Sequence, residues 1–230
     1  MKHYCIVNCQ NPIFTDKIKR YGYTLIAVEE SSNISKPVSL HADMLYLKTD
    51  KNHLFISDCQ TNNITALKNI GFTINTVNLS PGYKTECGLN MVVTDDMILH
   101  NPKTGVDICL SQKNKHIVYT RQGYTKCSTI VIGNNNFITE DESIFYALQK
   151  SGKNCLLIQK GYVKLKGYNY GFIGGASVYL EKENLLLFFG NITKHCNYYD
   201  IINFCSDIGV KIDFISEIEL TDIGGAICLF

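Results

Sequence analysis

The sequence lacks tryptophan, contains only four prolines and has no long apolar run. Its uninterrupted apolar stretches, such as Leu185 to Phe189, are far shorter than the roughly 20 residues that a transmembrane helix needs. The first residues also lack the apolar core and the small-residue cleavage site of a secretory signal peptide. We therefore expect a cytoplasmic protein that does not associate with membranes.

The sequence also lacks an excess of either charge. Its 22 lysines and arginines are balanced by 21 aspartates and glutamates, and the basic residues form no stripe. A nearly neutral protein without a basic surface has no electrostatic attraction to a phosphate backbone. Nucleic acid is therefore not expected as a partner.

Ten cysteines are present, but they include no Cys-x-x-Cys pair of the kind that structural zinc sites use. Several, including Cys155 and Cys205, lie within apolar segments, and we expect most of them to be reduced, buried thiols. The glycines do not form the Gly-x-Gly-x-x-Gly or Gly-Lys-Ser/Thr patterns that hold nucleotide phosphates. We expect neither a metal ion nor an organic cofactor.

A repeated pattern runs along the whole chain instead. Helix-like segments are expected at 13–21, 64–70, 106–113, 144–151 and 199–208. Each is followed by a glycine or an asparagine, the residues that most readily end a helix in the left-handed conformation, and then by a strand. After each strand come a loop and a motif, and in four cases a second strand follows the motif. The motifs are centred on His41, Asn90, Cys127, Gly175 and Gly225.

Repeat units of about 46 residues cannot bury their apolar faces alone, so they must pack against one another. No capping unit is recognisable at either end, and a closed ring needs none. We expect one α/β domain over residues 1–230, a five-fold pseudosymmetric α/β-propeller of helix–strand–strand units. The approximate unit boundaries are 1–58, 59–101, 102–140, 141–190 and 191–230.

Three stretches of the chain resemble a known family: Gln122–Ser128, Ile138–Ile144 and Tyr170–Ser177. They are similar to an uncharacterised bacterial family of unknown function that shares the pentein fold. This is the α/β-propeller of the guanidine-modifying enzymes, which include arginine and agmatine deiminases, dimethylarginine hydrolase and amidinotransferases. The resemblance implies a cysteine thiolate that attacks a guanidinium carbon, a histidine acting as acid and then as base, carboxylates that hold the cation, and no metal ion.

Four residues are candidates for catalysis. His41 and Asp43 lie two residues apart on an expected strand, so they share a face, and an imidazole beside a carboxylate suits general acid–base chemistry. The resemblance implies the same pair as catalytic histidine and guanidinium-binding aspartate. Cys127 follows Lys126, and a neighbouring cation favours a thiolate. Cys228 lies near the end of the last unit, where the resemblance places the nucleophile. Which of the two thiols reacts stays open, because either could be a buried apolar side chain.

The candidate substrate-binding residues are Asn90, Ser128, Gly174, Gly175 and Asp222. Two copies of Ile-Gly-Gly-Ala bring glycine pairs into the fourth and fifth motifs. We favour close strand packing at a narrow centre as their role over a ligand loop. Asp222 precedes the second pair and suits either a cation site or a turn. Asp141 is expected to cap the following helix.

The resulting hypothesis is a hydrolase or transferase that acts on a guanidine- or amidine-type small molecule through a Cys/His/Asp centre. The alternative is a non-catalytic module that binds a protein or ribonucleoprotein partner. An open cavity bordered by His41, Asp43 and a thiol would favour the enzyme, whereas an apolar centre would favour the binding module. The sequence leaves the oligomeric state open.

Overall fold

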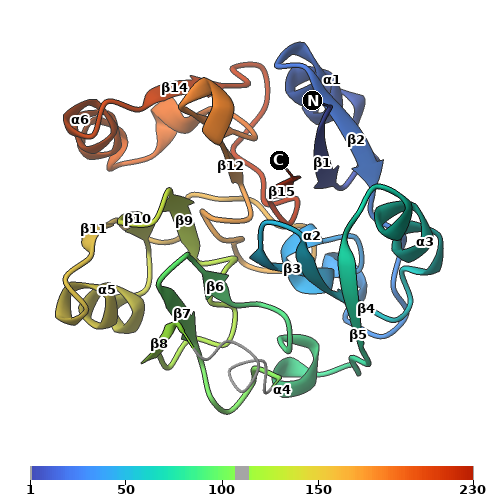
Figure 1. Cartoon of the computed structure of the whole chain (residues 1–230). Coiled ribbons are helices and arrows are strands. Elements are labelled where there is room, and N and C mark those ends of the chain that lie inside the picture. The colour runs from blue at the N-terminus through green and yellow to red at the C-terminus, as the bar shows by residue number, and fades with distance from the viewer. Residues whose placement is uncertain (1, 107–113, 230) are drawn as a thin grey trace.

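The computed structural model describes residues 2–106 and 114–229. Within these residues, the strands form five three-stranded sheets that surround a common centre (Figure 1). The fold is therefore mixed α/β, and its five small sheets fit the five-fold repeat expected from the sequence. No helix in these two ranges is long and apolar enough to cross a membrane.

Every sheet has the same order of an inner, a middle and an outer strand. The inner strand runs antiparallel to the middle strand, which runs parallel to the outer strand. The inner strands are β3 (Tyr46–Asp50), β6 (Val92–Val93), β9 (Thr129–Ile132), β12 (Ser177–Leu180) and β15 (Ala226–Leu229). The middle strands are β4 (His53–Ser57), β7 (Met97–His100), β10 (Asn136–Thr139), β13 (Leu185–Phe188) and β1 (His3–Val7). The outer strands are β5 (Thr73–Val77), β8 (His116–Tyr119), β11 (Asn154–Leu157), β14 (Lys211–Phe214) and β2 (Tyr23–Ala27).

In four of the sheets a helix connects the middle strand to the outer strand, which is a common crossover for a parallel pair. They are α3 (Thr61–Asn69), α5 (Glu142–Lys150), α6 (Tyr198–Asp207) and α1 (Pro12–Arg20). These four confirm the expected helices to within three residues at either end. The fifth expected helix, at 106–113, lies almost wholly outside the described residues. Single helical turns are α2 (Ala42–Leu45) and α4 (Tyr83–Glu86), together with 3-10 turns at Lys36–Val38, Glu181–Glu183 and Ile192–Lys194.

Local sequence explains where the longer helices begin and end. The Asn11 side chain accepts a hydrogen bond from the Ile13 amide, and proline occupies the first helical position of α1. Asp141 caps α5 in the same way through the Ile144 amide, as expected. After α1, Gly22 takes φ of +82°, a conformation that residues with a side chain rarely adopt.

The two ends of the chain meet in one sheet. Strand β15 pairs antiparallel with β1, with Tyr4 opposite Leu229, so the N-terminal strand supplies the second strand that the last motif lacks. Each sheet consequently combines strands from two neighbouring repeat units of the sequence. The first unit, for example, contributes β1 and β2 to one sheet and β3 and β4 to the next.

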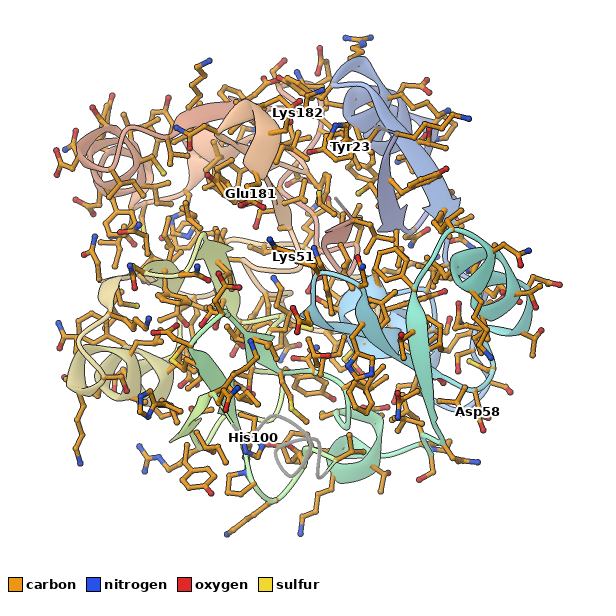
Figure 2. The ribbon with its side chains drawn as sticks, in the orientation of Figure 1. Tyr23, Lys51, Asp58, His100, Glu181 and Lys182 are labelled. Carbon is orange, nitrogen blue, oxygen red and sulfur yellow. The ribbon has the colours of Figure 1, made fainter. Side chains whose placement is uncertain are left out.

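The middle strands supply much of the apolar core, and side chains fill the space between the ribbon elements (Figure 2). Every middle strand has at least two fully buried residues, which include Ile6, Ile56, Ile98, Phe137 and Leu187. A strand whose two faces are both buried reads as an apolar run rather than as an alternating pattern, which agrees with these segments. Some buried polar side chains lie just before the inner strands, among them His41, Asn90 and Asp222.

Candidate functional site

Hydrogen bonds connect the five motif stretches in one circuit, and each motif lies directly before an inner strand or runs into it. The backbone links, donor first, are Asp43–Gly224 (3.0 Å), Ile223–Gly175 (3.0 Å) and Gly175–Cys127 (3.1 Å). The Asn90 side chain completes the circuit, since its Oδ1 accepts from the Cys127 amide (3.2 Å) and its Nδ2 donates to the Asp43 carbonyl (2.9 Å). We refer to the five motif stretches, residues 40–44, 88–94, 123–128, 172–177 and 223–228, as the hub.

The glycine pairs allow the hub backbones to touch. A Cβ at Gly174 would lie 2.4 Å from the Lys126 carbonyl oxygen and 2.5 Å from that of Thr129. A Cβ at Gly175 would lie 2.0 Å from an Asp222 carboxylate oxygen, and Gly224 has φ of +82° directly against the His41 backbone. These contacts favour the packing interpretation of the Gly-Gly motifs over a ligand loop.

Replacing Gly174 with alanine is therefore expected to destabilise the fold by about 2 kcal/mol, because the facing atoms are backbone carbonyls that cannot rotate away. Chemical denaturation measures this. The matched control is Gly133→Ala, where a Cβ meets nothing within 4 Å and only the backbone conformation, with φ of +61°, is unfavourable. Equal losses for the two variants would contradict close packing at the hub.

His41 lies between two buried carboxylates. It precedes the short helix α2, so the strand expected around His41 and Asp43 starts only at Tyr46. The His41 Nδ1 is nevertheless 4.0 Å from Asp43 Oδ1 and 3.6 Å from Asp222 Oδ1, and all three residues are at most 4% exposed. In the described part of the chain, His41 Nδ1 and both Asp43 carboxylate oxygens have no hydrogen-bond partner. Leaving buried polar atoms without hydrogen-bond partners costs free energy of folding. Such atoms are therefore typical of a binding or catalytic site.

Asp222 is held rigidly by the hub backbone. Its Oδ2 accepts from the Phe172 amide and its Oδ1 from the Gly224 amide, both at 2.9 Å. Burial raises the pKa of its carboxyl, the nearby His41 counteracts this, and the charge of Asp43 raises it further. A cation placed between the two carboxylates would relieve both the desolvation and the repulsion.

Of the two candidate cysteines, Cys127 is the one whose thiol lies near His41 and the two carboxylates. Burial raises the pKa of this thiol well above its usual value, and the charges of Asp43 and Asp222 raise it further. The Asn90 Nδ2 donates to the Cys127 Sγ at 2.9 Å and opposes that shift. Asn90, a candidate substrate ligand, thus lies against the thiol and holds it in place.

His41, Cys127 and Asp222 line one cavity of about 260 Å³. Its remaining wall is mostly aromatic and apolar and includes Tyr124 and Phe172, whose rings are in contact at a tilt of 33° with centroids 5.8 Å apart. We call this space the central cavity. It joins an imidazole, a thiol and a carboxylate to flat apolar walls, a combination suited to a small planar cation.

One wall of the central cavity is fixed by a buried glutamate. The Tyr124 hydroxyl donates to Glu86 Oε1 at 2.7 Å, and the other Glu86 oxygen accepts from both the amide (2.9 Å) and the hydroxyl (2.6 Å) of Ser35. These hydrogen bonds outweigh burial and hold the pKa of the Glu86 carboxyl below its usual value. Through these hydrogen bonds, Glu86 of α4 connects the segment around Ser35 to the ring of Tyr124.

Cys228 lies elsewhere. It borders a second cavity of about 290 Å³, together with Lys48 and Lys126. Lys126 lines this cavity and not the one that contains Cys127, although the two residues are neighbours in sequence. The structure thus brings His41, Asp222 and Cys127 to the central cavity and leaves Cys228 apart from them. Asp43 lies next to His41 but does not itself line the cavity.

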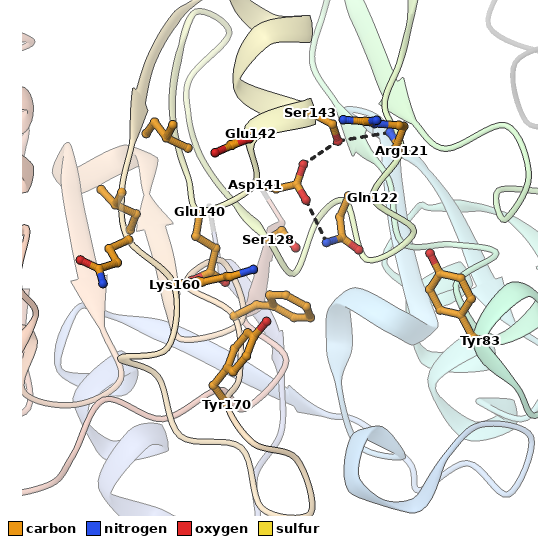
Figure 3. Close-up of a pocket in the computed structure, with 14 residues that line it drawn as sticks. Tyr83, Arg121, Gln122, Ser128, Glu140, Asp141, Glu142, Ser143, Lys160 and Tyr170 are labelled. Atoms are coloured by element: carbon orange, nitrogen blue, oxygen red, sulfur yellow. Dashed lines mark hydrogen bonds between the residues drawn. The ribbon is translucent and has the colours of Figure 1, made fainter.

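Ser128 and Glu140 face a third, outer cavity of about 610 Å³ (Figure 3). The Ser128 hydroxyl and Glu140 Oε2 are buried there without a partner in the described residues, while Glu140 Oε1 accepts from the Ile173 amide at 3.3 Å. Burial raises the pKa of Glu140 to about 8, and the charge of Lys160 opposes this shift. The outer and central cavities share Tyr170 and Phe172 as a common wall.

The sequence signals missed several of these residues. Glu140 belongs to an acidic cluster that is typical of a helix start, a role that its neighbours fill: Asp141 is the cap and Glu142 lies in the first turn. Tyr124 and Phe172 lie inside the stretches that carry the family resemblance, but an aromatic residue in an apolar segment is indistinguishable from core. Glu86 has no pattern around it that would distinguish it from a surface residue. No group of three or more His, Cys, Asp or Glu side chains within 2–106 and 114–229 is arranged to hold a metal ion.

Solved structures that superpose on this chain include guanidine-modifying enzymes of the pentein fold. A dimethylarginine dimethylaminohydrolase, in an adduct with 4-chloro-2-hydroxymethylpyridine, superposes with a TM-score of 0.57 at 9% identity, covering 94% of this chain and 93% of its own. An amidinotransferase of Microseira wollei from saxitoxin biosynthesis gives 0.56 at 10% identity, with 88% and 75% covered. The agmatine deiminase of C. jejuni gives 0.52 at 12% identity, with 94% and 88% covered. Identities this low establish a common fold.

Residues 6–227 match a family described as a family of unknown function, DUF6873. The chain belongs to this family, as the resemblance of its motifs predicted. No curated protein matches the sequence.

Proposed function

We propose that this protein is a thiol-dependent enzyme that hydrolyses, or transfers a group from, a guanidine- or amidine-type small molecule bound in the central cavity. One observation carries the proposal: a thiol, an imidazole and a carboxylate border a single cavity, with a second unpartnered carboxylate 4.0 Å from the imidazole. The centre therefore contains a cavity with a thiol, an imidazole and a carboxylate in its wall rather than a solid apolar core, which favours an enzyme over a binding module. The neighbours named as dimethylarginine hydrolase and agmatine deiminase support the substrate class.

We further propose that the five sheets form a closed propeller around this cavity. The circuit of hydrogen bonds through all five hub stretches supports closure, as does the pairing of the first and last strands. Residues 1–230 are then one domain. A ring of this kind explains how residues as distant as His41 and Asp222 reach the same cavity.

In the proposed reaction, Asp43 and Asp222 bind the amidinium cation and the Cys127 sulfur attacks its central carbon. The thiol proton passes to His41, which then gives it to the departing amine as the carbon–nitrogen bond breaks. His41 next removes a proton from water, the oxygen attacks the same carbon, and the carbon–sulfur bond breaks. The departing thiolate then takes that proton from His41, which restores both the thiol and the neutral imidazole. In a transferase, an amine takes the place of water.

A bound amidinium substrate would itself activate Cys127, the nucleophile that attacks it. Without ligand, the carboxylates and burial keep Cys127 protonated. A bound positive charge within a few ångströms reverses the electrostatic contribution and favours the thiolate. The free protein should accordingly react slowly with neutral thiol reagents at neutral pH.

The test is covalent capture with 2-chloroacetamidine, followed by peptide mapping. We expect modification at Cys127, and we expect His41→Ala to slow it about 100-fold because the base that accepts the thiol proton is lost. Cys228→Ser is the matched control and should leave the rate unchanged. Modification confined to Cys228, or a Cys127 rate that His41→Ala does not reduce, would overturn the proposed centre.

A further inference from the structure

The two ends of the chain carry cysteines that face each other across a sheet. Cys5 of β1 and Cys228 of β15 are direct partners in the antiparallel register. Directly opposed antiparallel residues have Cα atoms about 4.5–5.5 Å apart and side chains on the same face, which falls within the range that disulfides span. The Cys228 side chain is also the main cause that raises the pKa of Cys5, ahead of burial, which agrees with this pairing.

We propose that Cys5 and Cys228 form a redox-responsive disulfide that joins the first and last strands. Cys5 is fully buried, whereas Cys228 is partly exposed and borders the second cavity. The volume of that cavity, about 290 Å³, is large enough for several molecules of the size of water. A small oxidant such as hydrogen peroxide can therefore reach Cys228. Cys228 is therefore the thiol that is oxidised first, and Cys5 is the thiol that completes the bond.

The chemistry balances with one peroxide. The Cys228 sulfur loses its proton and attacks a peroxide oxygen; the oxygen–oxygen bond breaks, a sulfenic acid forms, and the departing hydroxide takes a proton to become water. The Cys5 sulfur then loses its proton and attacks the Cys228 sulfur. The sulfur–sulfur bond forms, the sulfur–oxygen bond breaks, and a second water leaves. Two thiols lose two electrons in total, and the peroxide gains them.

The bond would close a loop that contains almost the whole chain. Cross-links that close long loops restrict the unfolded state most strongly, so the oxidised protein should melt about 5–10 °C higher than the reduced protein. This effect does not depend on the proposed enzyme activity, because Cys228 and Cys127 border different cavities.

The experiment treats the full-length wild-type protein with hydrogen peroxide, blocks the remaining thiols under denaturing conditions and maps the peptides. We expect one linked pair, Cys5 with Cys228, and a rise in Tm that dithiothreitol reverses. Cys228→Ser should abolish the rise, and Cys205→Ser, which alters a buried thiol on α6, should preserve it. A free Cys5 after oxidation, Cys228 linked to another cysteine, or a linked pair without a change in Tm would each overturn the proposal.

Discussion

The Asp43→Asn, Asp222→Asn double variant is expected to lose about 1000-fold in the preference of Cys127 for a cationic over a neutral alkylating agent. Both carboxylates are buried near the thiol, and both raise its pKa. Two charges about 4 Å apart interact by roughly 4 kcal/mol at the effective dielectric constant of a protein surface. If each carboxylate contributes only half of that energy, the two together change the ratio of the two rates by about 1000-fold.

The measurement compares the rate constants of 2-chloroacetamidine and 2-chloroacetamide, which have nearly the same shape and differ in charge. The ratio of the two rates cancels changes in the accessibility of the thiol. The neutral reagent should react faster with the double variant than with the wild type, because the thiolate is no longer opposed by two negative charges. Asp200→Asn, which removes an exposed carboxylate on α6, is the charge-matched control. An unchanged ratio in the double variant would show that these carboxylates do not bind the cation.

Replacing Glu140 with glutamine is expected to remove most of the pH dependence of stability between pH 4.5 and 8. Burial raises the pKa of Glu140 to about 8 from 4.5. The folded protein therefore keeps a proton that the unfolded chain releases above pH 4.5, so stability falls as the pH rises through this window. At roughly 1.4 kcal/mol per unit, the fall approaches about 5 kcal/mol for the wild type.

Denaturation at pH 5 and pH 8 measures this difference. Glu140→Gln should have similar stability at both values, and at pH 8 it should be the more stable protein. Glu142→Gln is the matched control, because Glu142 is exposed in the first turn of α5 and should change stability by less than about 1 kcal/mol. A wild-type protein whose stability does not fall between these pH values would contradict a buried neutral Glu140.

A stable neutral Glu140 would also bear on what the outer cavity binds. Its free Oε2 and the Ser128 hydroxyl are both buried and both border that cavity, next to the aromatic wall shared with the central cavity. A substrate larger than the amidine group itself could extend toward them. Ser128 therefore remains a candidate for substrate binding, in the outer rather than the central cavity.

The local elements were determined by the sequence alone. The glycines after the helices, Pro12 at a helix start and Asp141 as a cap act through atoms within a few residues, so their patterns predict α1 and α5 directly. The regular spacing of the motifs likewise indicated the repeat, and His41 with Asp43 could be recognised as a pair. These features depend on short-range sterics and hydrogen bonds, which a sequence pattern records.

The site itself was decided by tertiary structure. Cys127 rather than Cys228 lies with His41, because the hub brings residues 86 positions apart to one cavity while β15 carries Cys228 to another. The pairing of β1 with β15 places Cys5 opposite Cys228, although these residues are at opposite ends of the chain. Such contacts depend on how whole sheets pack, and no local propensity encodes them. The burial that raises the pKa of Asp222 and of Glu140 likewise arises only from the packing of the folded chain.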